Sequence, residues 1–199
     1  MTDSRYQLRP ASRSGPPAVA PPRTVVLIGL MGAGKTSIGR RLATRLGLPF
    51  RDADHEIEAA AGCTIPEFFA RYGEAEFRAG ERRVIARLLT EEPVHVLATG
   101  GGAYMDPQTR ELIRDHGISI WLKAELDVLV ARTGRRNNRP LLRQGNPKDI
   151  LARLIETRYP VYAGADVTVA TDDAPLAEST GRVLAALKAY LARQPEGTR

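Results

Sequence analysis

Residues 29–36 read Gly-Leu-Met-Gly-Ala-Gly-Lys-Thr, a full match to the phosphate-loop pattern G-x-x-x-x-G-K-[ST]. The continuous apolar run 24–29 leads into this motif, and a helical pattern at 35–46 follows it. The glycines let backbone N–H groups converge on an anion, Lys35 can bridge the outer phosphates, and Thr36 offers a hydroxyl to Mg²⁺. A glycine turn with a purely structural role would need neither Lys35 nor Thr36. The motif therefore predicts a strand, a phosphate-binding loop and a helix in register.

Short apolar or β-branched runs alternate with helical patterns along the rest of the chain. We expect strands at 24–29, 49–53, 94–98, 118–122 and 167–170, and helices at 35–46, 81–90, 126–132 and 176–191. Such alternation favours a parallel sheet, and a continuously apolar first strand indicates helices on both faces. The predicted fold is α/β, a doubly wound three-layer α/β/α sandwich with a five-stranded parallel sheet.

The 199 residues suit one globular domain, which we place at 24–195. Residues 1–23 are rich in Pro, Ser, Ala and Arg and lack a continuous apolar block, so we expect a disordered N-terminal extension. The same basic composition also fits a weak targeting segment. No apolar run approaches the roughly 20 residues that a membrane span requires, so no membrane association is expected. A chain of this size is expected to be a monomer.

The net charge of +6 is divided between the extension and the domain. Residues 1–23 contain four arginines and one aspartate, which is half of the excess. The remaining positive charge gathers near residues 132–143 without interleaved aromatic residues, a pattern unlike a nucleic-acid surface. We therefore expect an anionic small molecule, not nucleic acid, as the partner.

Cysteine and histidine chemistry is not indicated. Cys63 is the one cysteine, which excludes an internal disulfide and suits a reducing cytoplasm. It lies in a helix-end sequence, where a small buried or capping role is expected. His55, His95 and His116 are widely separated, so they do not predict a zinc site. His55 is expected to cap the helix after the second strand.

A long loop at 133–148 combines Gly, Pro and Asn with four arginines, Arg135, Arg136, Arg139 and Arg143. Loops of this length inside a domain tend to be functional, and an arginine-bearing loop in a nucleotide enzyme suggests a closing lid. The alternative is a merely solvated basic loop.

Asp52 and Asp54 stand at the end of the second predicted strand. Alternation along an extended chain would put both carboxylates on the same side of that strand. One could order Mg²⁺ while the other reaches a substrate hydroxyl, as phosphoryl transfer requires. Alone, the D-x-D pattern is weak, since it also occurs in turns and helix caps.

Five motifs in this order resemble the shikimate kinase family: the phosphate loop, the aspartate pair, Phe77-Arg78-x-x-Glu81, the glycine triplet Gly100, Gly101 and Gly102, and Arg139-Pro-Leu-Leu. The resemblance extends from about residue 24 to 171–175. It implies a P-loop kinase fold of the nucleoside monophosphate kinase type with a mobile lid. It also implies transfer of the γ-phosphoryl group of ATP to the 3-hydroxyl of shikimate, giving shikimate 3-phosphate and ADP for aromatic amino acid biosynthesis.

The resemblance further implies roles for individual residues. Asp54 would bind the substrate hydroxyls and act as base, and Arg139 would reach the transferring phosphates. Catalysis is assigned to Asp54, Lys35 and Arg139. ATP binding is assigned to Gly32, Ala33, Gly34, Lys35, Thr36, Ser37, Arg132 and Arg139. Shikimate binding is assigned to Asp54, Arg78, Gly100, Gly101, Gly102, Arg158, Phe69 and Phe77, and Mg²⁺ binding to Thr36 and Asp52.

Several of these residues also have a structural interpretation. The glycine triplet could be a flexible hinge, and Phe69 and Phe77 could be core residues of a helix face. Arg132 either lies near the adenine or completes a helix dipole. Glu81 follows Arg78 by three residues on a predicted helix, close enough to pair with it. Residues 171–175 lack an arginine that some family members have near adenine, which leaves the adenine clamp open.

Two other functions compete with this interpretation. Another small-metabolite P-loop kinase, such as a gluconate kinase, would share the loop and lid without necessarily combining Arg78, Arg158 and the glycine triplet. A regulatory P-loop switch would carry a guanine-reading Asn-Lys-x-Asp stretch, which the sequence lacks.

Overall fold

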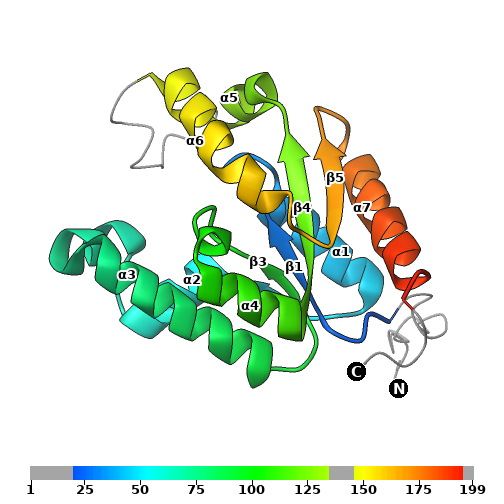
Figure 1. Cartoon of the computed structure of the whole chain (residues 1–199), viewed down its shortest axis with the longest axis horizontal. Coiled ribbons are helices and arrows are strands. Elements are labelled where there is room, and N and C mark those ends of the chain that lie inside the picture. Colours follow the sequence, from blue (N-terminus) through cyan, green and yellow to red (C-terminus); the bar gives the residue numbers. More distant parts are fainter. Residues whose placement is uncertain (1–19, 135–145, 195–199) are drawn as a thin grey trace, which may run out of the picture.

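A five-stranded parallel sheet forms the centre of the molecule (Figure 1). The computed structural model describes residues 20–134 and 146–194. The strands follow the spatial order β2-β3-β1-β4-β5. They are β1 (Thr24–Ile28), β2 (Phe50–Asp52), β3 (Val96–Ala98), β4 (Gly117–Ala124) and β5 (Val167–Thr171). The predicted five-stranded parallel sheet is confirmed.

Helices cover both faces of the sheet. Figure 1 shows α1 and α7 together on one face and α3 and α4 on the other. The helical elements are α1 (Lys35–Leu46), α2 (Ala53–Ala61), α3 (Ile65–Thr90), η1 (Ala103–Met105), α4 (Pro107–His116), α5 (Leu126–Gly134), α6 (Pro147–Tyr162) and α7 (Leu176–Leu191). Trp121 of β4 contacts Tyr159 and Tyr162, which places α6 on the face of α3 and α4. The three-layer sandwich is therefore also confirmed.

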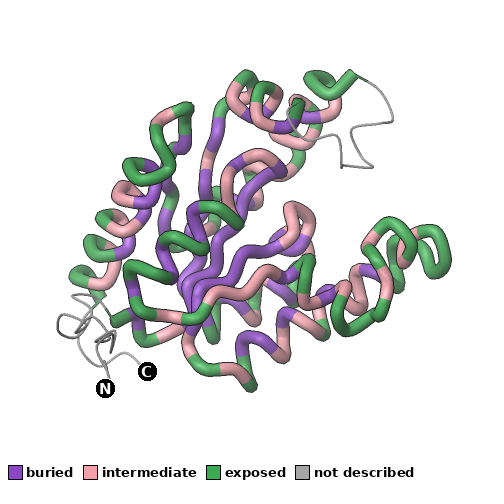
Figure 2. Tube along the Cα trace, turned by 180° about the vertical axis from the view of Figure 1, so that it is seen from behind, coloured by how far each residue is buried: buried purple, intermediate pink, exposed green. Residues whose placement is uncertain are grey.

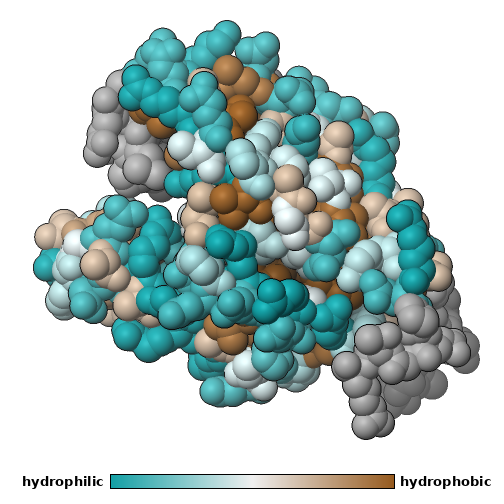
Figure 3. Space-filling view, viewed as in Figure 1, coloured by the Kyte–Doolittle hydropathy of each residue, from teal (hydrophilic) through white to brown (hydrophobic). Residues whose placement is uncertain are grey.

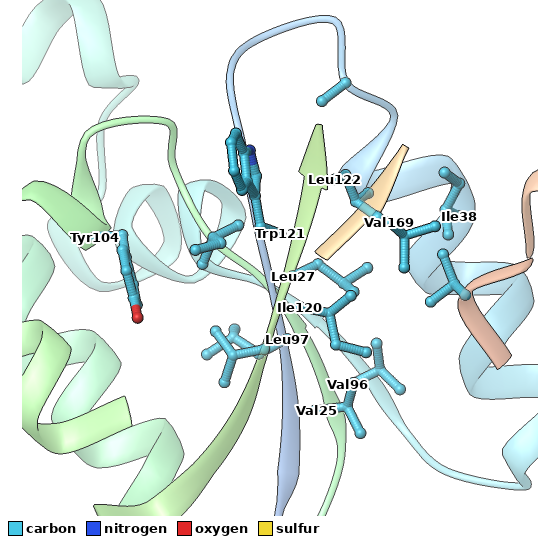
Figure 4. Packing of buried hydrophobic residues seen from close by; sticks show 14 of the residues in the cluster. Val25, Leu27, Ile38, Val96, Leu97, Tyr104, Ile120, Trp121, Leu122 and Val169 are labelled. Carbon is cyan, nitrogen blue, oxygen red and sulfur yellow. The ribbon is translucent and has the colours of Figure 1, made fainter. Parts of the chain in front are cut away.

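The core forms around the central strand β1, all of whose residues are buried. Its continuous run of β-branched and leucine side chains suits a strand covered on both faces. Figure 4 shows Val25 and Leu27 of β1 among side chains from the neighbouring strands, including Leu97 and Ile120. Because all strands are parallel, their carboxyl ends meet at one edge of the sheet, where ligands bind in such folds.

The α2–α3 arm, which we define as α2 and the part of α3 before Gly73, extends away from the sheet and is largely exposed (Figures 1 and 2). Thr64 and Glu67 form a capping box that starts α3. Gly73 has φ 78° and ψ 178°, so it breaks α3 into two helical segments. The segment after Gly73 returns to the body of the molecule.

The predicted elements agree with the structure where periodicity is regular. The bounds predicted for α1 and α7 match the observed helices. The helix predicted at 81–90 begins much earlier, at Ile65. A helix was expected after the second strand, where α2 lies, whereas α4 and α6 were not predicted. Residues 133–134 and 147–148 of the predicted loop belong to helices, because α5 extends to Gly134 and α6 begins at Pro147. Most of the predicted N-terminal extension, residues 1–19, lies outside the described residues.

Candidate active site

The phosphate loop connects β1 to α1 as predicted. Gly32 and Gly34 have φ of 87° and 96°, values that side chains with a Cβ rarely adopt. Gly34 caps α1 without a side-chain hydrogen bond, so the first turn of the helix presents N–H groups that no cap occupies. This arrangement is an anion cradle, strengthened by the positive end of the helix dipole.

Lys35 lies against the loop it follows. Its Nζ donates hydrogen bonds to the carbonyl of Gly29 at 2.7 Å and of Leu30 at 3.1 Å. The ammonium is therefore held beside the phosphate cradle by carbonyls of the cradle itself.

Thr36 and Asp52 join α1 to the end of β2. The Thr36 hydroxyl donates to Oδ2 of Asp52 at 2.8 Å. Oδ1 of the same carboxylate accepts the backbone N–H of Asp54 at 3.2 Å and caps α2. A hydroxyl and a carboxylate side by side are oxygen donors of the kind that Mg²⁺ prefers.

The strand geometry predicted for the aspartate pair is wrong. β2 ends at Asp52, and Asp54 lies in the first turn of α2. Asp52 and Asp54 are connected because the Asp52 side chain caps the helix that carries Asp54, not because alternate strand residues share a side. His55 lies inside α2, so its predicted capping role belongs instead to Asp52.

The glycine triplet is enclosed by charged side chains from three elements. A Cβ at Gly100 would lie 2.9 Å from Oδ1 of Asp54 and 2.8 Å from Oε1 of Glu81. A Cβ at Gly101 would lie 3.3 Å from Nη1 of Arg158, and one at Gly102 only 2.6 Å from Nη1 of Arg78. The structure thus brings together Asp54, Arg78 and Arg158, as predicted. A side chain at any of these three positions would meet these charged groups of the protein itself.

Arg78 is paired with a buried carboxylate. Its Nη1 lies 2.6 Å from Oε2 of Glu81, whose exposed fraction is 3%. Nη2 also contacts the exposed Glu74 at 3.3 Å. Burial raises the pKa of the Glu81 carboxyl, against the opposing effect of Arg78. Burial also acts to lower the pKa of Arg78, but its two glutamates outweigh it and raise that pKa.

Phe69 and Phe77 meet across the bend at Gly73. Their ring centroids are 4.5 Å apart. Eight residues of straight helix would separate their Cα atoms by about 12 Å, so the bend brings the rings together. Phe77 is buried and also contacts the Arg78 guanidinium at 5.2 Å, whereas Phe69 is only partly buried. Phe77 thus has the core role that the sequence left as an alternative, while it also borders the site.

Arg132 connects the phosphate loop to the loop after β5. Its Nη1 donates to the Gly32 carbonyl at 3.2 Å, and its Nη2 donates to the Asp172 carbonyl. Asp172 is itself held by Arg182, which lowers the pKa of that carboxyl to about 2. The hydrogen bonds of Arg132 therefore go to the loops that follow β1 and β5, not to the last carbonyls of α5.

Arg139 and most of the predicted lid lie outside the described residues. The described ends of that segment are the last turn of α5 and the first turn of α6. Figure 3 shows a hollow beside the α2–α3 arm, on the side that faces α6 in Figure 1. Arg78 on α3 and Arg158 on α6 come from different elements, and both guanidinium groups lie next to the glycine triplet.

Tyr162 at the end of α6 was not identified from the sequence. Its hydroxyl donates to the carbonyl of Gly101, the same oxygen that accepts Nη1 of Arg158 at 2.8 Å. The available signal was the spacing Arg158-x-x-x-Tyr162, which puts both side chains on one face of a helix.

Within the described residues, the structure does not indicate a metal centre of His, Cys, Asp or Glu side chains or a membrane span. No group of three His, Cys, Asp or Glu side chains there could hold a metal ion. Cys63 is partly exposed between α2 and α3. None of the helices in residues 20–134 and 146–194 combines the length and apolar composition that crossing a membrane needs.

A phosphate loop with lysine and threonine, placed beside carboxylates and arginines at the carboxyl ends of a parallel sheet, defines a P-loop kinase. The family model described as shikimate kinase matches residues 31–188. The chain belongs to the shikimate kinase family and is a phosphotransferase that uses ATP.

Individual relatives agree with this assignment. The shikimate kinase of Paramagnetospirillum magneticum is 59% identical over 170 residues, covering 85% of this chain and 86% of the relative. That of Caulobacter vibrioides is 57% identical over 166 residues, with 83% and 82% coverage.

Solved structures agree as well. A structure of shikimate kinase from Acinetobacter baumannii in complex with shikimate superposes with a TM-score of 0.80 at 38% identity, covering 87% of this chain and 96% of that one. A gluconokinase from Sinorhizobium meliloti shares the fold with a TM-score of 0.56 at 24% identity, with coverage of 87% and 98%.

Proposed function

We propose that this chain transfers the γ-phosphoryl group of ATP to the 3-hydroxyl of shikimate, giving shikimate 3-phosphate and ADP. The observation that carries this proposal is the position of the glycine triplet. A Cβ at Gly101 would lie 3.6 Å from the Gly29 carbonyl and 3.7 Å from the Met31 nitrogen, so the triplet adjoins the phosphate loop. The groups around the triplet therefore hold an acceptor within reach of the terminal phosphate.

The donor side consists of the phosphate loop and Lys35. Backbone N–H groups at the start of α1 bind the phosphate oxygens, from Gly32 through Ser37. Lys35 exchanges its loop carbonyls for phosphate oxygens and stabilises the charge that develops during transfer. Arg132 borders the adenine end through its contacts with Gly32 and Asp172.

The acceptor side consists of Arg78, Arg158 and Asp54. Guanidinium groups suit a planar carboxylate because they donate two parallel hydrogen bonds, so Arg78 and Arg158 bind the shikimate carboxylate. Asp54 accepts the proton of the 3-hydroxyl as the hydroxyl oxygen forms its bond to the γ-phosphorus. The bond from that phosphorus to the β,γ-bridging oxygen breaks, and ADP leaves with the bridging oxygen. Phe69 and Phe77 border the ring of the acceptor.

The Thr36 hydroxyl and the Asp52 carboxylate, 2.8 Å apart, are the oxygen groups that would hold a magnesium ion. Thr36 would do so directly and Asp52 through water. When bound, Mg²⁺ neutralises charge on the β- and γ-phosphate oxygens.

Arg139 completes the proposal from the predicted lid at 133–148. We assign it to the transferring phosphate, where a guanidinium is worth on the order of a thousandfold in rate. We further expect residues 24–195 to act as one kinase domain, in a monomer and in the cytoplasm, which light scattering and cell fractionation would test.

A coupled ADP-release assay with shikimate, gluconate and a nucleoside monophosphate in parallel tests the proposal against its rivals. Turnover is expected with shikimate alone. Turnover with gluconate would favour the other small-metabolite kinase, and no acceptor-dependent ADP release at all would favour a nucleotide-binding switch.

A further inference from the structure

Tyr162 and Arg158 share one acceptor in the glycine triplet. Both donate to the carbonyl oxygen of Gly101, Arg158 through Nη1 at 2.8 Å and Tyr162 through its hydroxyl. A carbonyl oxygen has two lone pairs, so these two donors use its full capacity. Tyr162 is 1% exposed and forms the last residue of α6, one turn after Arg158.

This shared carbonyl fixes the direction of two groups at once. The peptide unit after Gly101 is planar and trans, so turning its oxygen toward α6 aims the N–H of Gly102 to the opposite side. The Arg158 guanidinium is planar, so a hydrogen bond at one nitrogen also restricts where the rest of the fork points.

Tyr162 is itself held rigidly. Its ring lies edge-on to Trp121, with centroids 6.0 Å apart, and to Tyr104 at 6.3 Å. Burial raises the pKa of the Tyr162 hydroxyl, which keeps it protonated and able to donate at physiological pH.

We propose that Tyr162 is a positioning residue for the carboxylate of the acceptor substrate, because it holds the Gly101 carbonyl in the orientation that aims Arg158. The inference rests on the proposed function and deepens it. Tyr162 touches neither substrate in this scheme; it acts through Gly101 and Arg158.

The same aromatic cluster offers a matched control. The Tyr159 hydroxyl, three residues earlier on α6, donates to the Ala124 carbonyl, which lies outside the glycine triplet. Its ring packs 4.8 Å from Trp121. Tyr159→Phe and Tyr162→Phe therefore each remove one hydroxyl bound to a backbone carbonyl, and only the second loses a contact with the site.

Steady-state kinetics of the two variants tests the inference. Tyr162→Phe is expected to raise the KM for shikimate about 3- to 10-fold, as loss of one net hydrogen bond does. The kcat and the KM for ATP should change less than about 2-fold, a margin well below the expected effect. Tyr159→Phe should leave all three constants near wild type. Both variants should lower the melting temperature by a similar amount, because each loses one hydroxyl bound to a backbone carbonyl. Equal KM values in the two variants would overturn the inference.

A substrate without the carboxylate charge separates positioning from general damage. With the methyl ester of shikimate, wild type and Tyr162→Phe should have similar KM values, because the ester lacks the carboxylate charge that Arg158 binds. If Tyr162→Phe raised the KM for the ester as much as the KM for shikimate, the inference would be contradicted. If Tyr162→Phe melts below the assay temperature, calorimetric shikimate binding at a lower temperature, where both variants are folded, gives the same comparison. Wild-type enzyme without shikimate turnover would instead refute the proposed function.

Discussion

The hydroxyl of Thr36 lies 2.8 Å from Oδ2 of Asp52, and this contact joins the phosphate loop to the acceptor side of the site. Thr36 lies in the first turn of α1, while Asp52 ends β2 and caps the helix that carries Asp54. One hydrogen bond therefore connects the helix proposed to bind the donor phosphates to the residue that caps the helix of the proposed base.

Thr36→Val should weaken the magnesium dependence of the reaction. The substitution keeps the shape of the side chain but removes the oxygen that would ligate the ion, so the Mg²⁺ concentration for half-maximal rate should rise by about 10-fold or more. Thr36→Ser keeps the hydroxyl and should remain within a few-fold of wild type. Titration of initial rate against Mg²⁺ gives both values, and identical curves for Thr36→Val and Thr36→Ser would contradict the assignment.

Asp54→Asn should abolish turnover and leave nucleotide binding intact. Loss of a general base costs about 10²- to 10⁴-fold in rate, whereas the amide leaves the Asp54 backbone N–H bonded to Asp52 as before. Lys35→Ala should impair both nucleotide affinity and kcat, because Lys35 belongs to the phosphate cradle. Calorimetric ATP binding beside kcat separates the two variants, and normal turnover by Asp54→Asn would show that Asp54 is not the base.

Glu81→Gln should weaken shikimate binding and lower stability. The amide cannot neutralise Arg78 in a site where Glu81 is almost fully buried, and the free energy of unfolding should fall by about 1–3 kcal/mol. Glu74→Gln is the control, because Glu74 contacts the same guanidinium from an exposed position and should cost less than about 1 kcal/mol. Urea unfolding and the KM for shikimate are measured for both variants. Equal losses of unfolding free energy in Glu81→Gln and Glu74→Gln would show that the buried Glu81 is no more important than the exposed Glu74.

Gly102→Ala should raise the KM for shikimate by about 10-fold, the equivalent of one charged hydrogen bond of ~1.5 kcal/mol. A Cβ there would lie only 2.6 Å from Nη1 of Arg78 and would displace that guanidinium. Gly80→Ala makes the same change inside α3, where the nearest side-chain atom is 4.0 Å away, and should stabilise the fold by about 0.5–1 kcal/mol without affecting KM. An unaltered KM in Gly102→Ala would show that Arg78 tolerates displacement.

The stability of the fold should fall below about pH 6.5 through His95. Burial lowers the pKa of His95 from 6.5, and the ring is 1% exposed. The unfolded chain therefore binds a proton more readily than the folded one, so the stabilising contribution is present above pH 6.5 and is lost as the pH falls through the lowered value. Melting temperatures across this window should fall less steeply for His95→Gln than for wild type. Equal slopes for His95→Gln and wild type across this window would contradict the role of His95.

Local sequence rules predicted the parts of this protein whose structure depends on local chemistry. The phosphate loop has its own glycine pattern, and α1 and α7 carry regular helical periodicity, so their bounds were predicted correctly. The arm was missed because its bend depends on one residue, Gly73, whose positive φ lies between two helical segments.

The site residues also divide into those that local motifs predict and those that depend on contacts distant in the sequence. Asp54, Arg78 and Arg158 were found through motifs, and the structure confirms that they come together around the glycine triplet. The helix α6 that carries Arg158 was missed because it starts with proline and contains Pro160. Tyr162 was missed because its partner is a backbone carbonyl 61 residues away, and its spacing from Arg158 indicates only that the two side chains share a helix face.

The glycine triplet has a consequence for inhibition of this enzyme. Resistance to a competitive inhibitor often arises when a residue lining the pocket acquires a bulkier side chain that excludes the compound but admits the substrate. At Gly100 and Gly102 an added carbon would lie only 2.6–2.9 Å from Asp54, Glu81 or Arg78 and would displace these side chains. A variant that excludes a compound resting on this stretch of bare backbone is therefore expected to weaken its own acceptor binding as well.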